Sequence, residues 1–157
     1  MDKIAVFVDV QNIYYTTRQV YNRQFDYRKL WQRINARGEI IIANAYAIDR
    51  GDDKQQKFQN ALKTIGFNVK LKPYIQRRDG SAKGDWDVGI TIDVLQCAQR
   101  VDTVVLLSGD GDFDLLMDKI TSDYAVKTEV YGVKALTADS LINSTALFNP
   151  IDESLLL

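Results

Sequence analysis

The chain has 157 residues, of which 46% are hydrophobic and 26% are charged, and this is typical of one globular domain, expected to span residues 1–157. It has no histidine and one cysteine, Cys97. This excludes an internal disulfide, zinc fingers, Cys-His nucleophile pairs and Ser-His-Asp triads. Catalysis would therefore depend on carboxylates, lysine, tyrosine, a hydroxyl group or a metal ion bound by oxygen ligands.

No apolar stretch approaches the roughly 20 residues that cross a bilayer, and residues 1–3 lead into a strand-like run instead of a signal peptide. We therefore expect a cytoplasmic protein with no membrane partner. The net charge is −1 and the pI is near 5.4, but the charges segregate. Residues 18–37 and 70–83 are mainly basic, whereas residues 102–123 are mainly acidic. This pattern suits either an acidic site with basic approaches or the solvated faces of ordinary helices.

The first half of the chain is predicted to contain strands at residues 4–10, 39–48 and 67–74. Helices are predicted directly after the first strand, at residues 27–36 behind an Asp26 N-cap, and from Asp52 or Asp53 to Gly66. The first apolar run is continuous, as in strands buried on both faces of a parallel sheet. The third alternates apolar and polar residues, which favours an edge position.

The second half begins with a polar, glycine-containing loop at residues 76–84, of the kind that is often functional. A helix over residues 85–100 and a central strand over residues 103–107 are predicted next. They are followed by an amphipathic helix with Phe113, Leu116, Met117 and Ile120 on one face, a strand over residues 126–133 and a last helix over residues 137–148.

Strands that alternate with helices predict an α/β fold, a Rossmann-like three-layer α/β/α sandwich with a mainly parallel five-stranded sheet in the order 3-2-1-4-5. Strands 1 and 4 are then neighbours where the winding reverses. Ligands of open α/β sheets bind beyond the carboxyl ends of the strands at this switch point. The two strand ends are marked by Asp9 and Asp110.

Carboxylates gather at these strand ends. Asp9 closes a buried strand, so it needs hydrogen-bond donors, a cation or an exposed strand end, and N-capping of the next helix is the alternative role. Asp110 and Asp112 stand two residues apart at the start of a helix, where capping competes with a functional role for Asp112. Asp114 and Asp118 are expected on the solvated face of that helix.

Asp85 and Asp87 begin the helix that leads into the fourth strand, and a helix N-terminus is expected to lower their pKa. Carboxylates within several Å of each other repel, and a divalent cation offsets that repulsion at neutral pH. Ligation by oxygen alone is the preference of Mg²⁺, Mn²⁺ or Ca²⁺, and the first two suit phosphate chemistry best.

Three segments occur in order at the ends of the predicted elements: Phe7-Val8-Asp9-Val10-Gln11-Asn12, Lys83-Gly84-Asp85-Trp86-Asp87 with Asp93 following, and Leu107-Ser108-Gly109-Asp110-Gly111-Asp112-Phe113. Together they resemble the LabA-like branch of the NYN domain family, in the PIN-like nuclease superfamily. The resemblance spans about residues 3 to 147. It implies a PIN-like, metal-dependent ribonuclease fold with an acidic pocket.

The resemblance also implies roles for individual residues. The catalytic and metal-site carboxylates would be Asp9, Asp87, Asp110 and Asp112. Asn12 and Ser108 would orient them, Lys83 would face phosphate, and Asp85 and Asp93 would support the site. Asp93 follows Asp87 by six helical residues and so points roughly 120° away, which indicates a supporting or structural role.

The leading hypothesis is hydrolysis of RNA phosphodiester bonds with one or two Mg²⁺ or Mn²⁺ ions at the four aspartates. RNA, with single strands favoured, would be guided by Arg77, Arg78 and Lys83. Trp86 or Tyr74 would stack on a base, although packing under the loop is an equal alternative for Trp86. We expect Tyr14, Tyr15 and Tyr21 in the core or on the helix surface, and a homodimer is an open alternative for the assembly.

Two other functions fit the same pattern. One is a catalytically idle module that holds nucleic acid or a nucleotide in this cleft and acts through a partner, but every acidic motif position is intact. The other is a phosphatase or phosphotransferase with an aspartyl nucleophile after strand 1. Such enzymes usually carry a second aspartate two residues later, where this chain has Gln11.

Overall fold

The computed structural model describes residues 1–73, 75–76, 82–83 and 85–157. Its strands are β1 (Lys3–Asp9), β2 (Glu39–Asp49), β3 (Asn68–Pro73), β4 (Ile75–Gln76), β5 (Ala82–Lys83), β6 (Thr103–Leu107), β7 (Lys127–Gly132) and β8 (Leu147–Pro150). Its α-helices are α1 (Val10–Tyr21), α2 (Tyr27–Asn35), α3 (Asp53–Ile65), α4 (Asp87–Cys97), α5 (Asp114–Tyr124) and α6 (Asp139–Ser144). Among the residues described, no helix is long and apolar enough to cross a membrane.

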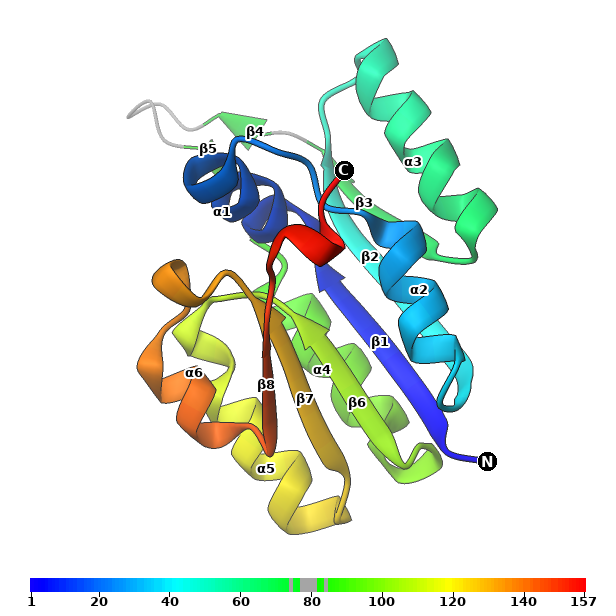
Figure 1. Cartoon of the computed structure of the whole chain (residues 1–157), viewed down its shortest axis with the longest axis vertical. Helices are drawn as coiled ribbons and strands as arrows, with labels where there is room; N and C mark the ends of the chain where they lie inside the picture. The colour runs from blue at the N-terminus through cyan, green and yellow to red at the C-terminus, as the bar shows by residue number, and fades with distance from the viewer. Residues whose placement is uncertain (74, 77–81, 84) are drawn as a thin grey trace.

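The main sheet has six parallel strands in the order β3-β2-β1-β6-β7-β8 (Figure 1). Numbered by their appearance in this sheet, the strands run 3-2-1-4-5-6. The predicted order is therefore confirmed for the first five strands, including the edge position of β3 and the adjacency of β1 and β6. The winding reverses between these two strands, which places the predicted switch point at their carboxyl ends.

Two cores lie on opposite faces of this sheet. The first receives Ile13 of α1, Leu30 of α2 and Leu62 of α3, and the second receives apolar residues of α4, α5 and α6. In β1 the residues from Ile4 to Val8 are all buried, because alternate side chains enter the two cores. The three-layer α/β/α sandwich is thus confirmed, and its central strand delivers Asp9 to the sheet edge.

The C-terminal part of the chain differs from the prediction. The helix expected over residues 137–148 ends at Ser144, and β8 follows it as a sixth strand beside β7. Phe148 packs against the second core from this strand. The spacing from Leu141 to Phe148 suits a helical face as well as a strand after a short helix, so the sequence pattern alone did not separate them.

The predicted loop over residues 76–84 also differs in part. Its two ends contribute to the short strands β4 and β5, which pair antiparallel with Ile75 opposite Lys83. Strands of two residues are too short to show an alternation in the sequence. Residues 77–81 and 84 lie outside the described residues.

Candidate metal and phosphate site

The candidate site lies at the carboxyl ends of the two central strands. Asp9 is the last residue of β1, and Asp110 follows β6 by three residues. The two strands pair in parallel, with Val8 opposite Leu107, so their ends reach the same edge of the sheet. The topology therefore brings together two aspartates that are about a hundred residues apart in the chain.

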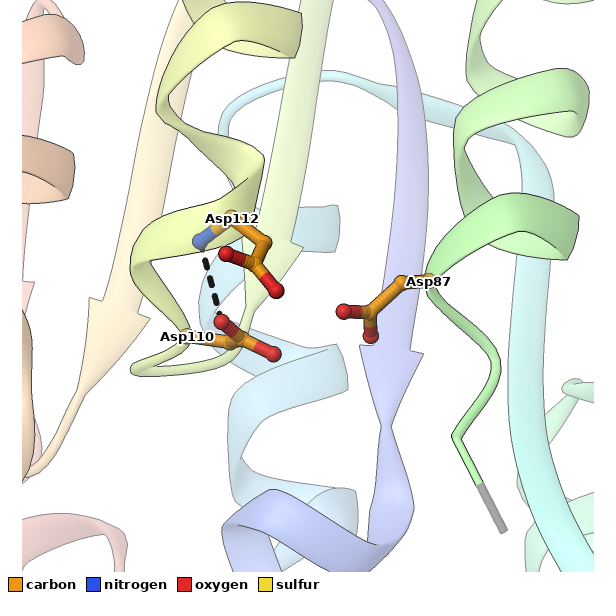
Figure 2. A group of neighbouring side chains, drawn as sticks. All are labelled: Asp87, Asp110 and Asp112. Atoms are coloured by element: carbon orange, nitrogen blue, oxygen red, sulfur yellow. Dashed lines mark hydrogen bonds between the residues drawn. The ribbon is translucent and has the colours of Figure 1, made fainter. Parts of the chain in front are cut away.

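Three carboxylates converge at this edge, as Figure 2 shows. One oxygen each from Asp87, Asp110 and Asp112 lies within 4.8 Å of the other two. Asp87 is the first residue of α4, whereas Asp110 and Asp112 belong to the turn that leads into α5. Separate segments thus direct their carboxylates at one point, which is the arrangement that oxygen-ligated cations require.

The capping roles in this turn can now be assigned. Oδ1 of Asp110 accepts a hydrogen bond from the backbone N–H of Asp112 at 2.9 Å, so Asp110 caps the turn. The side chain of Asp112 is exposed and directed toward Asp87 (Figure 2). The residue that caps this turn is therefore Asp110 and not Asp112.

Asp9 lines a pocket together with two of these carboxylates, Asp87 and Asp110. It is not a member of the group within 4.8 Å in the part of the chain that the structure describes. Its Oδ1 accepts a 3.5 Å hydrogen bond from the backbone N–H of Asn12, and its Oδ2 accepts a 3.1 Å hydrogen bond from the hydroxyl of Ser108. Asp9 therefore caps α1 and also presents its carboxylate to the pocket.

Ser108 and Asn12 hold the two strand ends together. The buried Ser108 hydroxyl also accepts a 3.1 Å hydrogen bond from the backbone N–H of Asp110, and Oδ1 of Asn12 accepts one from Gly109 at 2.9 Å. A Cβ at Gly109 would lie 2.7 Å from the carbonyl oxygen of Leu136, so only glycine allows this close approach. The turn that carries Asp110 is thus fixed on both sides.

Burial and nearby negative charges raise the pKa of two of these carboxyl groups, Asp9 and Asp87. Burial is the main cause that raises the pKa of Asp9 to about 6, against the lowering effect of its hydrogen bond from Ser108. Burial and the nearby Asp110 carboxylate raise the pKa of Asp87 to about 7. The pKa of Asp87 is therefore raised and not lowered as predicted, because desolvation and repulsion outweigh the helix N-terminus. A cation would relieve this repulsion.

The pocket has a volume of about 240 Å³, and its wall includes residues that the sequence reasoning did not assign. Besides Asp9, Asn12, Asp85, Asp87 and Asp110, it is lined by Gln11, Tyr15 and Thr16 of α1. Tyr15 had been expected simply on the helix surface or in the core. The signal that points to it is its spacing of four residues from Gln11, on the helix that Asp9 caps.

Asp85 and Trp86 support the start of α4. Oδ1 of Asp85 accepts a 3.2 Å hydrogen bond from the backbone N–H of Asp87. The indole N–H of Trp86 donates to the carbonyl of Ala47 at 2.9 Å, and Nζ of Lys72 lies 4.4 Å from the centre of a ring of that indole. These contacts within the chain favour the packing alternative for Trp86 over stacking on a base.

Asp93 faces away from the carboxylate group. Its Oδ2 accepts a hydrogen bond from the hydroxyl of Tyr46 and forms an ion pair with Nζ of Lys70, both at 2.7 Å. Asp93 therefore links α4 to β2 and β3. Of the predicted RNA-contacting residues, Arg77, Arg78 and Tyr74 lie outside the described residues, and Lys83 is described only as part of β5.

The residues at the site fit a divalent cation. The three clustered side chains are all carboxylates, and one oxygen of each lies within 4.8 Å of the other two. Among the described residues that line the pocket, no lysine or arginine neutralises their charge. Hard cations such as Mg²⁺ and Mn²⁺ prefer such oxygen ligands. The structure therefore contains an acidic cluster that could bind a metal ion.

Fold and site together define a parallel α/β/α protein with an acidic pocket at the switch point of its sheet. The chain belongs to the NYN domain family, whose model matches residues 3–152. It is 29% identical over 151 residues to the low amplitude and bright protein LabA of Synechococcus elongatus, covering 91% of this chain and 80% of that protein.

Two solved structures are similar to this chain in fold. A protein of unknown function from Vibrio parahaemolyticus is 52% identical, with a TM-score of 0.95 over 99% of this chain and 96% of that one. A ribokinase from Giardia lamblia is 9% identical with a TM-score of 0.53, covering 98% of this chain and 58% of that chain. The second likeness concerns the fold alone.

Proposed function

We propose that the protein is a metal-dependent ribonuclease that hydrolyses RNA phosphodiester bonds at the acidic pocket. The observation that carries this proposal is the convergence of the Asp87, Asp110 and Asp112 carboxylates at the switch point of an NYN-family sheet. These three residues, with Asp9 beside them, would hold Mg²⁺ or Mn²⁺. When bound, such an ion activates a water molecule and neutralises charge on the scissile phosphate.

The chain's own groups have complementary roles in this proposal. Ser108 and Asn12 fix the orientation of the Asp9 carboxylate, which lies at the carboxyl end of β1. Burial raises the pKa of Asp9 to about 6 in the metal-free site, and a bound cation would favour its charged form. Arg77, Arg78 and Lys83 would attract the phosphate backbone from the loop before α4.

Two alternative functions, an idle binding module and an aspartyl phosphotransferase, differ from a ribonuclease in features that can be tested or observed. An idle binding module would share the pocket but would not cleave RNA. An aspartyl phosphotransferase usually has a carboxylate two residues after its nucleophile, and here that position is held by Gln11, whose side chain lines the pocket without an acidic proton. This observation favours direct hydrolysis over a phosphorylated Asp9.

The decisive experiment incubates the pure protein with end-labelled single-stranded RNA and with DNA of the same sequence, in Mn²⁺, Mg²⁺ or EDTA. We expect RNA fragments in both metals and none in EDTA. Asp87→Asn and Asp112→Asn should each lower the rate about 100-fold or more, as expected for the loss of preorganised electrostatic groups. Stable binding of RNA without cleavage in either metal would favour the idle module instead.

A matched control distinguishes the site from acidity in general. Asp118 is an exposed aspartate on α5, and Asp118→Asn removes the same charge outside the carboxylate group. It should leave both cleavage and Mn²⁺ affinity unchanged. Calorimetric titration with Mn²⁺ should give weaker binding for Asp112→Asn, whose side chain does not cap the turn. Equal affinities of Asp112→Asn, Asp118→Asn and the wild type would contradict the metal site.

A further inference from the structure

One wall of the acidic pocket carries no acidic side chain. It is formed by α1, where Gln11 and Tyr15 are separated by four residues and both line the pocket next to Asp9 and Asp87. Arg18 follows at the next turn of the same side of the helix. The side chains with which α1 lines the pocket are uncharged, so this wall adds nothing to the repulsion among the carboxylates.

Tyr15 presents an aromatic surface to solvent at this wall. Its exposed fraction is 48%, which leaves much of a large apolar ring in contact with water. Tyr14, exposed by 45%, meets Tyr15 edge to face with ring centroids 5.4 Å apart. The neighbouring ring restricts Tyr15, so an incoming planar group would lose little side-chain entropy by packing on it.

The charge along α1 suits a nucleic-acid backbone. No aspartate or glutamate occurs between Asp9 and Asp26, whereas Arg18 and Arg23 lie in this segment. Nη1 of Arg18 donates a 2.9 Å hydrogen bond to the Tyr14 hydroxyl, which holds the guanidinium at the helix surface beyond the aromatic pair. A strand that leaves the acidic pocket along α1 would therefore meet a polar amide, an aromatic ring and a positive charge in that order.

From this order we infer that α1 forms a base-binding wall, in which Tyr15 stacks on an unpaired nucleobase beside the scissile phosphate and the Gln11 amide contacts the base edge. The Gln11 side chain can both donate and accept hydrogen bonds, as base edges require. Arg18 would contact the next phosphate. The inference rests on the proposed function, because it takes RNA as the ligand.

This wall predicts a preference for single strands. A base inside a duplex stacks on its neighbours and cannot present its face to a side chain, so only unpaired bases can use Tyr15. It also assigns stacking to α1, whereas the ring of Trp86 is held by Ala47 and Lys72. The alternative is that Tyr15 is an exposed helical side chain with no role in binding.

The test measures binding by fluorescence anisotropy in EDTA, which prevents metal-dependent cleavage. The probes are a labelled single-stranded RNA of 12 nucleotides and a labelled blunt-ended RNA duplex that contains the same strand. Tyr15→Ala should weaken single-strand binding about 5- to 100-fold, as expected for the loss of one stacked base, and should change duplex binding little. Tyr15→Phe retains the ring and should bind as the wild type does.

Val20→Ala is the control, because it shortens an exposed apolar side chain of the same helix that does not line the pocket. Its effect on single-strand binding should be much smaller than that of Tyr15→Ala. A 2-aminopurine base placed near the scissile position should also lose fluorescence on binding to the wild type but not to Tyr15→Ala. Wild-type affinity of Tyr15→Ala, or equal losses for the single strand and the duplex, would overturn the base-binding wall.

Cleavage by the wild type in Mn²⁺ is measured separately. If the wild type cleaves RNA and Tyr15→Ala binds it normally, the base-binding wall is wrong and the proposed function stands. If Tyr15→Ala loses single-strand binding but the wild type cleaves nothing, the wall stands and the nuclease proposal is wrong.

Discussion

The hydroxyl of Ser108 donates a 3.1 Å hydrogen bond to Oδ2 of Asp9, which joins the carboxyl ends of β6 and β1 across 99 residues of sequence. The hydroxyl oxygen of Ser108 also accepts a hydrogen bond from the backbone N–H of Asp110. Ser108 is fully buried, so no solvent molecule can readily replace it. One small side chain thus positions two of the four carboxylates that are proposed to act together.

Ser108→Ala should raise the pKa of Asp9 further above about 6, because the hydrogen bond from Ser108 favours the charged carboxylate. The variant should also lose about 1–3 kcal/mol of unfolding free energy in EDTA, since a buried backbone N–H at Asp110 is left without its acceptor. Carboxyl ¹³C NMR titration measures the first effect and urea denaturation the second. Ser144→Ala, which removes a hydroxyl from the end of α6, is the control. An unchanged Asp9 titration would contradict the positioning role of Ser108.

The stability of the metal-free protein should depend on the titration of Asp87. Its pKa is about 7 in the folded protein and near 3.8 in the unfolded chain, so the folded state binds the proton more tightly. This contribution is fully present below about pH 4 and is lost as the pH rises through 7. Between these limits the unfolding free energy of the wild type should fall with rising pH.

Asp87→Asn should remove the part of this pH dependence that Asp87 contributes and leave the part due to Asp9. In EDTA at pH 8 the variant should be more stable than the wild type by about 1–2 kcal/mol, a range that allows for solvent screening of a half-buried group. Near pH 4 the two proteins should be nearly equal. Mn²⁺ at pH 8 should reverse the order, because the ion stabilises only a folded state that binds it. A difference in stability that does not vary between pH 4 and pH 8 would show that Asp87 titrates normally.

The sequence was sufficient for much of the site because topology alone brings Asp9 and Asp110 together. Strands β1 and β6 are adjacent in any sheet of this winding, and both aspartates lie at their carboxyl ends. The pKa of Asp87 was beyond prediction, because it depends on the distance to Asp110 across the pocket and on burial. No local pattern contains either quantity.

Two other features of the structure could not be predicted from the sequence, for related reasons. The position of Tyr15 on α1 could be predicted, but its proximity to the start of α4 depends on how α1 and α4 are placed around the end of β1. The sixth strand, β8, was not predicted because the spacing of the apolar residues after α6 is compatible with a helix as well as with a strand. In both cases tertiary packing decided between local alternatives.

The basic loop before α4 should contribute to RNA affinity through phosphate contacts. Changing Arg77, Arg78 and Lys83 together to alanine should weaken RNA binding and flatten its dependence on salt, because fewer counterions are then released. Mn²⁺ affinity should change little. The matched control changes three exposed lysines of α3 to alanine, namely Lys54, Lys57 and Lys63. Equal salt slopes in the loop variant and the wild type would place the RNA path elsewhere, most plausibly over Arg28, Arg33 and Arg37.

Asp9→Asn separates the chemical role of Asp9 from its structural role as the N-cap of α1. The carboxylate of Asp9 is charged at pH 8 against burial and against Asp110, so its pKa is raised, and removing the charge relieves that cost. Asparagine also caps helices well. In EDTA at pH 8 the variant should therefore be at least as stable as the wild type, whereas its cleavage should be lost and its Mn²⁺ affinity lowered. One urea series in EDTA and a second in Mn²⁺ measure both effects. A loss of about 1 kcal/mol or more in EDTA together with wild-type Mn²⁺ affinity would make Asp9 a structural residue, because only a charge-assisted hydrogen bond would then have been removed.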